Sequence, residues 1–201
     1  MTIQHNNDQE TKHNFIAGEW RNSSNHIQNI NPSDTNDVID SYAIATKDDV
    51  EDAVSAAMSA LPAWSSSTSG ERFDILDAIG TEIIQRKEEL GDLLAREEGK
   101  TLKEAVAEAH RAGSLFKFFA AEVYRSDTEG YRSLREGVSL QVQREPIGVV
   151  AAITPWNFPL AIPAWKIPPA LAYGNTVVFK PSELVCLSLI HISEPTRLRR
   201  I

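Results

Sequence analysis

The sequence predicts an α/β fold in which short strands and a helical layer precede an incomplete parallel sheet. Two continuous apolar runs, at 149–153 and 176–179, enclose a segment of helical length at 159–173. Strand, helix and strand within about 30 residues form a βαβ unit, and strands buried on both faces read as continuous apolar runs. Ahead of this unit, apolar residues recur at helical spacing over much of 46–123, which indicates the helical layer.

The N-terminal elements are predicted to be short strands. Residues 14–20, NFIAGEW, place a glycine between apolar and aromatic residues and suit a hairpin. A dense turn signal follows at 31–34, and Val38, Ile39 and Tyr42 suit a second short strand.

Three helices are expected next. Thr46 can cap the first, with Asp49 at its third position, and Pro62 with the serine-rich stretch 65–70 should end it. A longer second helix follows, because apolar residues over 73–94 fall roughly on one stripe.

Gly99 interrupts this pattern, and Thr101 can cap the third helix. We assign Phe116, Phe118 and Phe119 to core packing. The expected inward face comprises Leu102, Ala105, Val106, Ala109, Ala112, Phe116, Phe119 and Val123.

Two further features lie around the βαβ unit. Apolar and polar residues alternate from Val138 to Val142, which predicts a half-buried strand. Gly174 is a natural stop for the helix that precedes the second apolar run.

Composition limits the classes of partner. The formal net charge of −8 argues against a nucleic-acid or anionic-membrane partner, because both require a basic face. Cys186 is the single cysteine, so no internal disulfide framework is possible. No apolar run approaches the ~20 residues of a membrane span, and residues 1–13 are polar with no signal-peptide pattern. We expect a disordered terminus over 1–13, a cytoplasmic protein and no metal site.

The loop after the first apolar run, ITPWNFP over 153–159, contains the first candidate site residue. Ligands of open α/β sheets bind beyond the carboxyl ends of the strands. The amide of Asn157 can donate to a developing oxyanion there, which is worth about 3–4 kcal/mol in a transition state. Asn157 can equally cap a helix that begins at Pro159, and this loop alone leaves both interpretations open.

The second apolar run ends in KPSE, residues 180–183. Lys180 and Glu183 could hydrogen-bond the two hydroxyls of a ribose, and a carboxylate there would repel a 2′-phosphate and so favour NAD over NADP. A solvated surface pair is the alternative. No G-x-G-x-x-G lies between the two runs, so the usual pyrophosphate loop is absent here.

Longer motifs carry a resemblance. ITPWNFP followed by WKIPPALAYGNTVVFKPSE resembles the cofactor-side signature of the aldehyde dehydrogenase superfamily. NFIAGEW, INPSDTNDVI, AWSSSTSGERFDILDAIG, LLAREEGKTL and REPIGVV also resemble its N-terminal half, in order. The resemblance covers about residues 14–185. It implies the N-terminal part of that fold, with an incomplete Rossmann-like cofactor domain and a helical layer.

The resemblance also implies roles for single residues. Asn157 matches the side-chain donor of the oxyanion hole, and Lys166 matches a lysine linked to cofactor handling and proton movement. Phe158 and Trp165 match aromatic walls of the aldehyde tunnel. The cofactor, NAD with NADP as the alternative, would contact Ile153, Thr154, Pro155, Trp156, Lys180, Ser182 and Glu183.

In that family a cysteine thiolate attacks the aldehyde and hydride leaves for the nicotinamide, after which a glutamate-activated water releases the acid. Cys186 follows KPSE almost directly, whereas the family nucleophile lies far downstream, so we exclude it. We therefore expect the chain itself to be inactive and to fold poorly alone. Oligomers are expected only for the full-length protein, through a strand near 138–144.

The substrate interpretation rests on finer similarity. LAREEGKTL, FKFFAAEVYR and WKIPPALAYGN look most like 2,5-dioxovalerate (α-ketoglutarate semialdehyde) dehydrogenases. Succinate semialdehyde dehydrogenases commonly carry arginine where Trp165 stands, which counts against that substrate and leaves open which group here would bind a substrate carboxylate. Betaine aldehyde stays as an alternative within the family. A non-catalytic nucleotide-binding module and a truncated structural or regulatory paralogue are the alternatives from other classes.

The resemblance stops after Val185. LSLIHISEPTR, residues 187–197, is the translation of a transposon-end adapter used in preparing sequencing libraries. We predict that 186–201 is a non-native tail and that 14–185 is a partial NAD(P)-binding domain. A genuine but divergent helix is the alternative.

Overall fold

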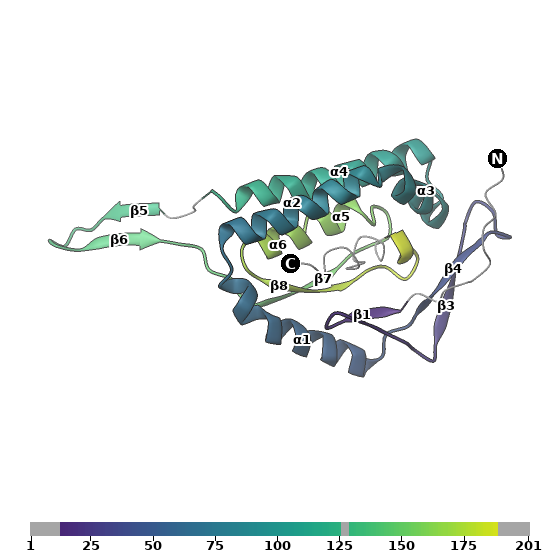
Figure 1. Cartoon of the computed structure of the whole chain (residues 1–201), viewed down its shortest axis with the longest axis horizontal. Coiled ribbons are helices and arrows are strands. Elements are labelled where there is room, and N and C mark those ends of the chain that lie inside the picture. The colour runs from purple at the N-terminus through teal and green to yellow at the C-terminus, as the bar shows by residue number, and fades with distance from the viewer. Residues whose placement is uncertain (1–12, 126–128, 189–201) are drawn as a thin grey trace.

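A computed structural model of the chain describes residues 13–125 and 129–188 (Figure 1). The predicted 1–13 terminus therefore lies almost wholly outside the described residues, as does most of the predicted tail. The fold is layered: α4 packs on α5 and α6, α2 also packs on α6, α6 packs on β8 of the parallel pair β7 and β8, and α1 lies on the other side of these strands. No described helix combines the length and the apolar character that crossing a bilayer requires.

The N-terminal strands form two antiparallel pairs. β1 (Asn14–Ile16) and β2 (Glu19–Arg21) make the predicted hairpin. The predicted strand β4 (Val38–Ala43) is present and pairs with β3 (His26–Ile30), which the sequence analysis did not predict. Because four of the five β3 side chains are exposed, its polar sequence shows no apolar alternation.

Helix α1 (Lys47–Ser65) begins where predicted, because Thr46 and Asp49 form a capping box. The helix ends at Ser65, where the predicted serine-rich stretch begins, but Pro62 does not stop it. Pro62 lies in the last turn, where its missing N–H removes a single helical bond. The carbonyl of Pro62 still accepts from the backbone N–H of Ser66.

The single helix predicted over 73–94 is two helices, α2 (Ser69–Gln85) and α3 (Lys87–Glu98). They meet at Arg86, whose φ of −97° and ψ of 12° are not helical. The Arg86 guanidinium bonds Glu82 on one helix and Glu89 on the other. Because the chain changes direction there, the apolar face of α2 and the apolar face of α3 can both pack against α4, and both helices contact it.

Helix α4 (Leu102–Glu122) is capped by Thr101, as predicted. Phe116 is buried and Phe119 packs against the core. Leu102 and Phe118, however, are 54% and 52% exposed, so their assignment to the core is wrong.

Two glycines set the crossing of α2 and α4. A Cβ on Gly80 would lie 2.7 Å from the backbone oxygen of Gly113, and a Cβ on Gly113 would lie 2.7 Å from that of Gly80. The two backbones are therefore too close for any side chain at this crossing. Around it, the core comprises the buried residues Leu76, Ile83, Leu90, Leu94, Ala105, Ala109, Ala112, Phe116, Leu160 and Ala164.

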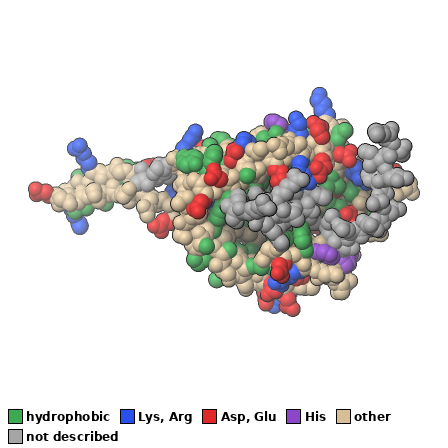
Figure 2. Space-filling view, viewed as in Figure 1, with side chains coloured by type: hydrophobic (Ala, Val, Ile, Leu, Met, Phe, Trp, Pro, Cys, Tyr) green, Lys and Arg blue, Asp and Glu red, His purple; other side chains and the backbone are tan. Residues whose placement is uncertain are grey.

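β5 (Glu129–Arg132) and β6 (Ser139–Val142) pair as an antiparallel hairpin that projects from the body (Figures 1 and 2). The strand predicted over 138–142 is confirmed as β6, but the prediction that it is half-buried is wrong: every residue of both strands is exposed. Within the described residues each strand pairs with the other alone, so nothing covers the apolar face.

The βαβ unit is confirmed. β7 (Val149–Ile153) and β8 (Thr176–Lys180) are parallel, and Gly174, at φ +81°, ends the helical segment between them. That segment is two short helices, α5 (Ala161–Ala164) and α6 (Ile167–Ala172), where one was predicted. The prediction that both strands are buried is wrong: of their ten residues two are buried, five are half-buried and three are exposed, and the described part of this sheet has two strands.

Candidate functional site

The two predicted site loops leave the same edge of the parallel sheet. Ile153 lies opposite Lys180 in the strand register, and the N–H of Thr154 donates to the carbonyl of Lys180 at 3.3 Å. The loop that carries Asn157 and the KPSE turn therefore start side by side, as the predicted shared site requires. If the two loops had left opposite edges of the sheet, they could not have formed one shared site.

The structure resolves the two interpretations of Asn157 in part. Helix α5 has no side-chain cap, and the backbone N–H groups of Leu160 and Ala161 donate instead to Glu108 Oε1 at 2.9 and 3.1 Å. The capping interpretation is therefore wrong, because a carboxylate from α4 takes that place. The Asn157 side chain is exposed, which leaves its amide available to a ligand.

The loop presents its apolar side chains outward. Ile153, Trp156 and Phe158 are 72%, 56% and 50% exposed, and Pro155 is exposed beside them. Thr154 points inward and is 4% exposed, and its hydroxyl has no hydrogen-bond partner among the described residues. A buried polar atom without a partner is costly, so a ligand that reaches Thr154 would gain a hydrogen bond.

Lys180 and Glu183 form an exposed ion pair, with Nζ 3.4 Å from Oε2. The backbone N–H of Glu183 and then Lys180 lower the pKa of this carboxyl, so it is ionised at neutral pH. One donor and one acceptor thus stand at the strand end. The hydroxyl of Ser182 accepts from the N–H of Leu184 at 3.3 Å and is buried, so it shapes the turn.

Trp165 and Lys166 lie between α5 and α6 and are both exposed. The ring of Trp165 packs edge-on against Phe119, with 6.3 Å between centroids. Lys166 precedes the first residue of α6 and makes no side-chain cap. The tunnel and proton-handling roles of these residues stay predictions.

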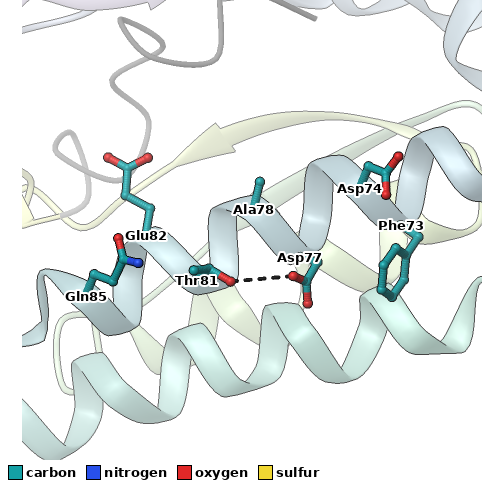
Figure 3. A pocket seen from close by; sticks show the side chains of 7 residues that line it. All are labelled: Phe73, Asp74, Asp77, Ala78, Thr81, Glu82 and Gln85. Atoms are coloured by element: carbon teal, nitrogen blue, oxygen red, sulfur yellow. Dashed lines mark hydrogen bonds between the residues drawn. The ribbon is translucent and has the colours of Figure 1, made fainter.

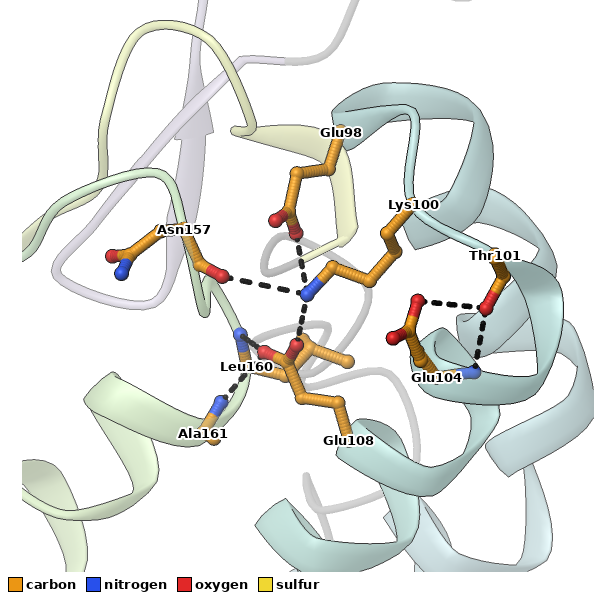
Figure 4. A network of polar contacts seen from close by, with 8 residues as sticks. All are labelled: Glu98, Lys100, Thr101, Glu104, Glu108, Asn157, Leu160 and Ala161. Atoms are coloured by element: carbon orange, nitrogen blue, oxygen red, sulfur yellow. Dashed lines mark hydrogen bonds and ion pairs between the residues drawn. The ribbon is translucent and has the colours of Figure 1, made fainter.

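Sequence reasoning missed a buried charged cluster behind the Asn157 loop (Figure 4). Lys100 Nζ lies 2.8 Å from Glu98 and 2.5 Å from Glu108, and 3.4 Å from the backbone oxygen of Asn157. Burial alone would lower the pKa of Lys100, but hydrogen bonds from its ammonium to Glu108 and Glu98 outweigh burial and raise this pKa. Burial also raises the pKa of Glu98. A signal was available: Glu108 is a charge within the otherwise apolar inward face of α4.

A second missed carboxylate anchors the segment after KPSE. Glu97 is 3% exposed and accepts from Asn29 Nδ2 at 2.5 Å and from the backbone N–H groups of Leu187 and Ser188, both at 2.7 Å. Burial raises the pKa of Glu97. The hydroxyl of Tyr42 also donates to the backbone oxygen of Glu183, so the KPSE turn is tied to the body on both sides.

Cys186 is buried and donates to the carbonyl of Ser182. Burial, aided by the charge of Glu97, raises the pKa of its thiol to about 12. At pH 8 about 10⁻⁴ of the thiol is then ionised, and the thiolate is the reactive form. In this 201-residue chain, where Cys186 is the single cysteine, we expect the folded state to react with iodoacetamide far more slowly than the urea-unfolded state, which provides the control. Equal rates in the two states would contradict a buried, protonated thiol.

A separate groove runs along one face of α2 and contains none of the predicted site residues (Figure 3). Its Asp77 is paired with Lys117 at 2.6 Å, so its acidic character is partly neutralised. The lining residues are Phe73, Asp74, Asp77, Ala78, Thr81, Glu82 and Gln85.

Comparison with known proteins identifies the family. Residues 20–197 match the profile of the Aldehyde dehydrogenase family. The chain is 40% identical to the alpha-ketoglutarate semialdehyde dehydrogenase of Haloferax volcanii over 90% of its own length and 38% of that protein's. It is also 40% identical to the alpha-ketoglutaric semialdehyde dehydrogenase of Bacillus subtilis, over 95% of its own length and 40% of that protein's. The chain thus spans about two fifths of these relatives.

Solved structures agree. A crystal structure of aldehyde dehydrogenase from Brucella melitensis superposes with a TM-score of 0.91 at 30% identity, covering 100% of this chain and 42% of that one. A point mutant of betaine aldehyde dehydrogenase from Staphylococcus aureus in complex with NAD+ superposes with a TM-score of 0.88 at 35% identity. This match covers 94% of this chain and 39% of that one. The fold and the family that the motifs predicted are confirmed, and the chain belongs to the aldehyde dehydrogenase family.

Proposed function

We propose that the complete protein oxidises an aldehyde to a carboxylic acid with NAD+ as hydride acceptor, and that its substrate is α-ketoglutarate semialdehyde. The observation that carries the proposal is the shared sheet edge, where the Asn157 loop and the Lys180–Glu183 pair start from opposite residues of two parallel strands. Ligands of α/β sheets bind at this edge.

The described residues fit a dinucleotide. Lys180 would donate to a ribose hydroxyl and Glu183 would accept from one, while Thr154 supplies a buried hydroxyl without a partner. The ionised Glu183 would repel a 2′-phosphate, which favours NAD over NADP. A family member with NAD+ bound superposes on this chain. When bound, the cofactor supplies the hydride acceptor.

In this proposal the protein's own groups bind and orient the aldehyde. The amide of Asn157 donates to the carbonyl oxygen as negative charge develops on it, which lowers the barrier to nucleophilic attack. The exposed aromatic rings of Phe158 and Trp165 would line the aldehyde path and exclude water, and Lys166 would assist proton movement. We assign neither the nucleophile nor the general base to a described residue, and the buried thiol of Cys186 is excluded.

The choice of aldehyde follows from the relatives. Two of the matching relatives are named as dehydrogenases of α-ketoglutarate semialdehyde. The succinate-semialdehyde dehydrogenase of Arabidopsis thaliana is 39% identical, so identity alone discriminates little. The neutral ring of Trp165 cannot pair with a carboxylate as an arginine would. Because α-ketoglutarate semialdehyde also carries a carboxylate, Trp165 does not discriminate between the two semialdehydes, and the proposed substrate rests on the names of the relatives.

We further propose that the complete enzyme is cytoplasmic and homo-oligomeric. The exposed apolar side chains of the β6 region, Val138, Leu140 and Val142, support an interface there. The proposed non-native tail at 186–201 rests on its sequence. The Glu97 contacts to Leu187 and Ser188 use backbone N–H groups that almost any residue would supply. The family profile, however, extends to residue 197, 12 residues beyond the end that the motifs predicted.

The experiment is a substrate comparison with the complete reading frame, recovered from genomic DNA. NADH formation is measured with α-ketoglutarate semialdehyde, succinate semialdehyde and betaine aldehyde. We expect kcat/KM for α-ketoglutarate semialdehyde to exceed the other two by about 10-fold or more. Faster oxidation of betaine aldehyde would overturn the substrate. NAD+ binding in titration calorimetry without turnover of any aldehyde would overturn the reaction and favour a nucleotide-binding module.

A further inference from the structure

The charged cluster behind the Asn157 loop joins the helical layer to the site. Lys100 is 13% exposed at its side chain, and Glu108 is 3% exposed. The Lys100 ammonium faces two carboxylates, the backbone oxygen of Asn157, and the ring of Phe158 at 4.7 Å from its centroid. One side chain therefore contacts two consecutive residues of the loop.

Glu108 holds the other end of the same loop. Its Oε2 pairs with Lys100, and its Oε1 accepts from the backbone N–H groups of Leu160 and Ala161. The backbone from 157 to 161 is thus fixed at both ends by one ion pair, and charge-assisted hydrogen bonds of this kind are about twice as strong as neutral ones. Glu108 stands on α4, which packs on α2 and α3, so the support is rigid.

The direction of the Asn157 side chain follows from this arrangement. Its backbone oxygen faces Lys100, and its amide lies on the far side of the Asn157 backbone from the cluster (Figure 4). Without Lys100, the carboxylates of Glu98 and Glu108, 14% and 3% exposed, would face each other without a cation. Uncompensated buried charge is strongly destabilising, so the loop backbone would shift.

We propose that Lys100 and Glu108 are positioning residues that aim the Asn157 amide at the substrate oxygen, an inference that rests on the proposed function. Neither residue is assigned contact with substrate or cofactor. They act on the rate through the loop backbone, and misplacement of a catalytic group by about 1 Å is enough to slow turnover.

The test uses the complete enzyme with the Lys100→Met variant. We expect kcat to fall about 10-fold while KM for NAD+ stays unchanged, because the loop shifts and the ribose pair does not. Lys100→Arg keeps the cation and should retain a rate within about 3-fold of wild type. Lys117→Met is the matched control, because it removes an ion-paired lysine of α4 that contacts Asp77 and Thr81.

A double-mutant cycle separates positioning from general destabilisation. If Lys100 acts through the amide of Asn157, Lys100→Met should have little effect in an Asn157→Ala background. Losses that multiply across the two variants would overturn the proposal, as would wild-type turnover by Lys100→Met.

Hydrogen exchange gives a readout that does not depend on activity. The amides of Leu160 and Ala161 should exchange faster in Lys100→Met and in Glu108→Ala than in wild type, and Lys117→Met should leave them protected. If the wild-type enzyme oxidises no aldehyde, the proposed function fails and exchange still reports on the cluster. Unchanged exchange in both variants would overturn the positioning role by itself.

Discussion

Replacing Asn157 with alanine in the complete enzyme is expected to lower kcat by about 10²–10³-fold, the usual loss for one oxyanion-hole donor. The structure favours an effect of this size because the Asn157 side chain is exposed at the sheet edge, and the capping of α5 falls to Glu108 instead. The folded state should therefore tolerate the change. Steady-state NADH formation measures the loss.

Asn157→Asp provides the matched variant, because it keeps the shape of the side chain and removes the donor. We expect it to be at least as slow as Asn157→Ala, since a carboxylate also repels a developing oxyanion. NAD+ affinity should be unchanged in both, because the Lys180–Glu183 pair lies at and after the end of β8. A kcat near wild type for Asn157→Ala would refute the oxyanion role, and a large drop in the unfolding midpoint would assign the residue to stability instead.

Replacing Gly80 with alanine is expected to destabilise the protein by about 2 kcal/mol, even though alanine favours helix by about 1 kcal/mol. The added Cβ would meet the backbone oxygen of Gly113 at 2.7 Å, and backbone cannot rotate away as a side chain can. Helices α2 and α4 must separate, which loosens the core between them. The midpoint of urea unfolding measures the change.

Gly70→Ala is the control within the same helix. A Cβ there would meet only the Thr68 hydroxyl at 3.9 Å, so helix propensity should leave stability equal or slightly higher. An unfolding midpoint for Gly80→Ala at or above that of Gly70→Ala would contradict the close crossing. Gly113→Ala should match Gly80→Ala, because the two contacts are reciprocal.

The sequence by itself determined the features that depend on near neighbours. The capping box at Thr46 and the cap at Thr101 need partners three residues away, and Gly174 adopts its left-handed conformation wherever the helix stops. The apolar runs of β7 and β8 likewise carry their own signal, and the motifs around Asn157 and Lys180 identified the family.

Only the tertiary structure decided which distant groups meet. Nothing local marks Arg86 as a break, Glu108 as the cap of α5, or Gly80 as the partner of Gly113, since each depends on a second element brought close by packing. The exposure of Leu102, Phe118 and β6 also depends on packing. An apolar pattern leads to burial only when another part of the structure covers it, and no described element covers these side chains. Interactions between residues close in the sequence determined where helices and strands form, and tertiary packing determined which of them are in contact.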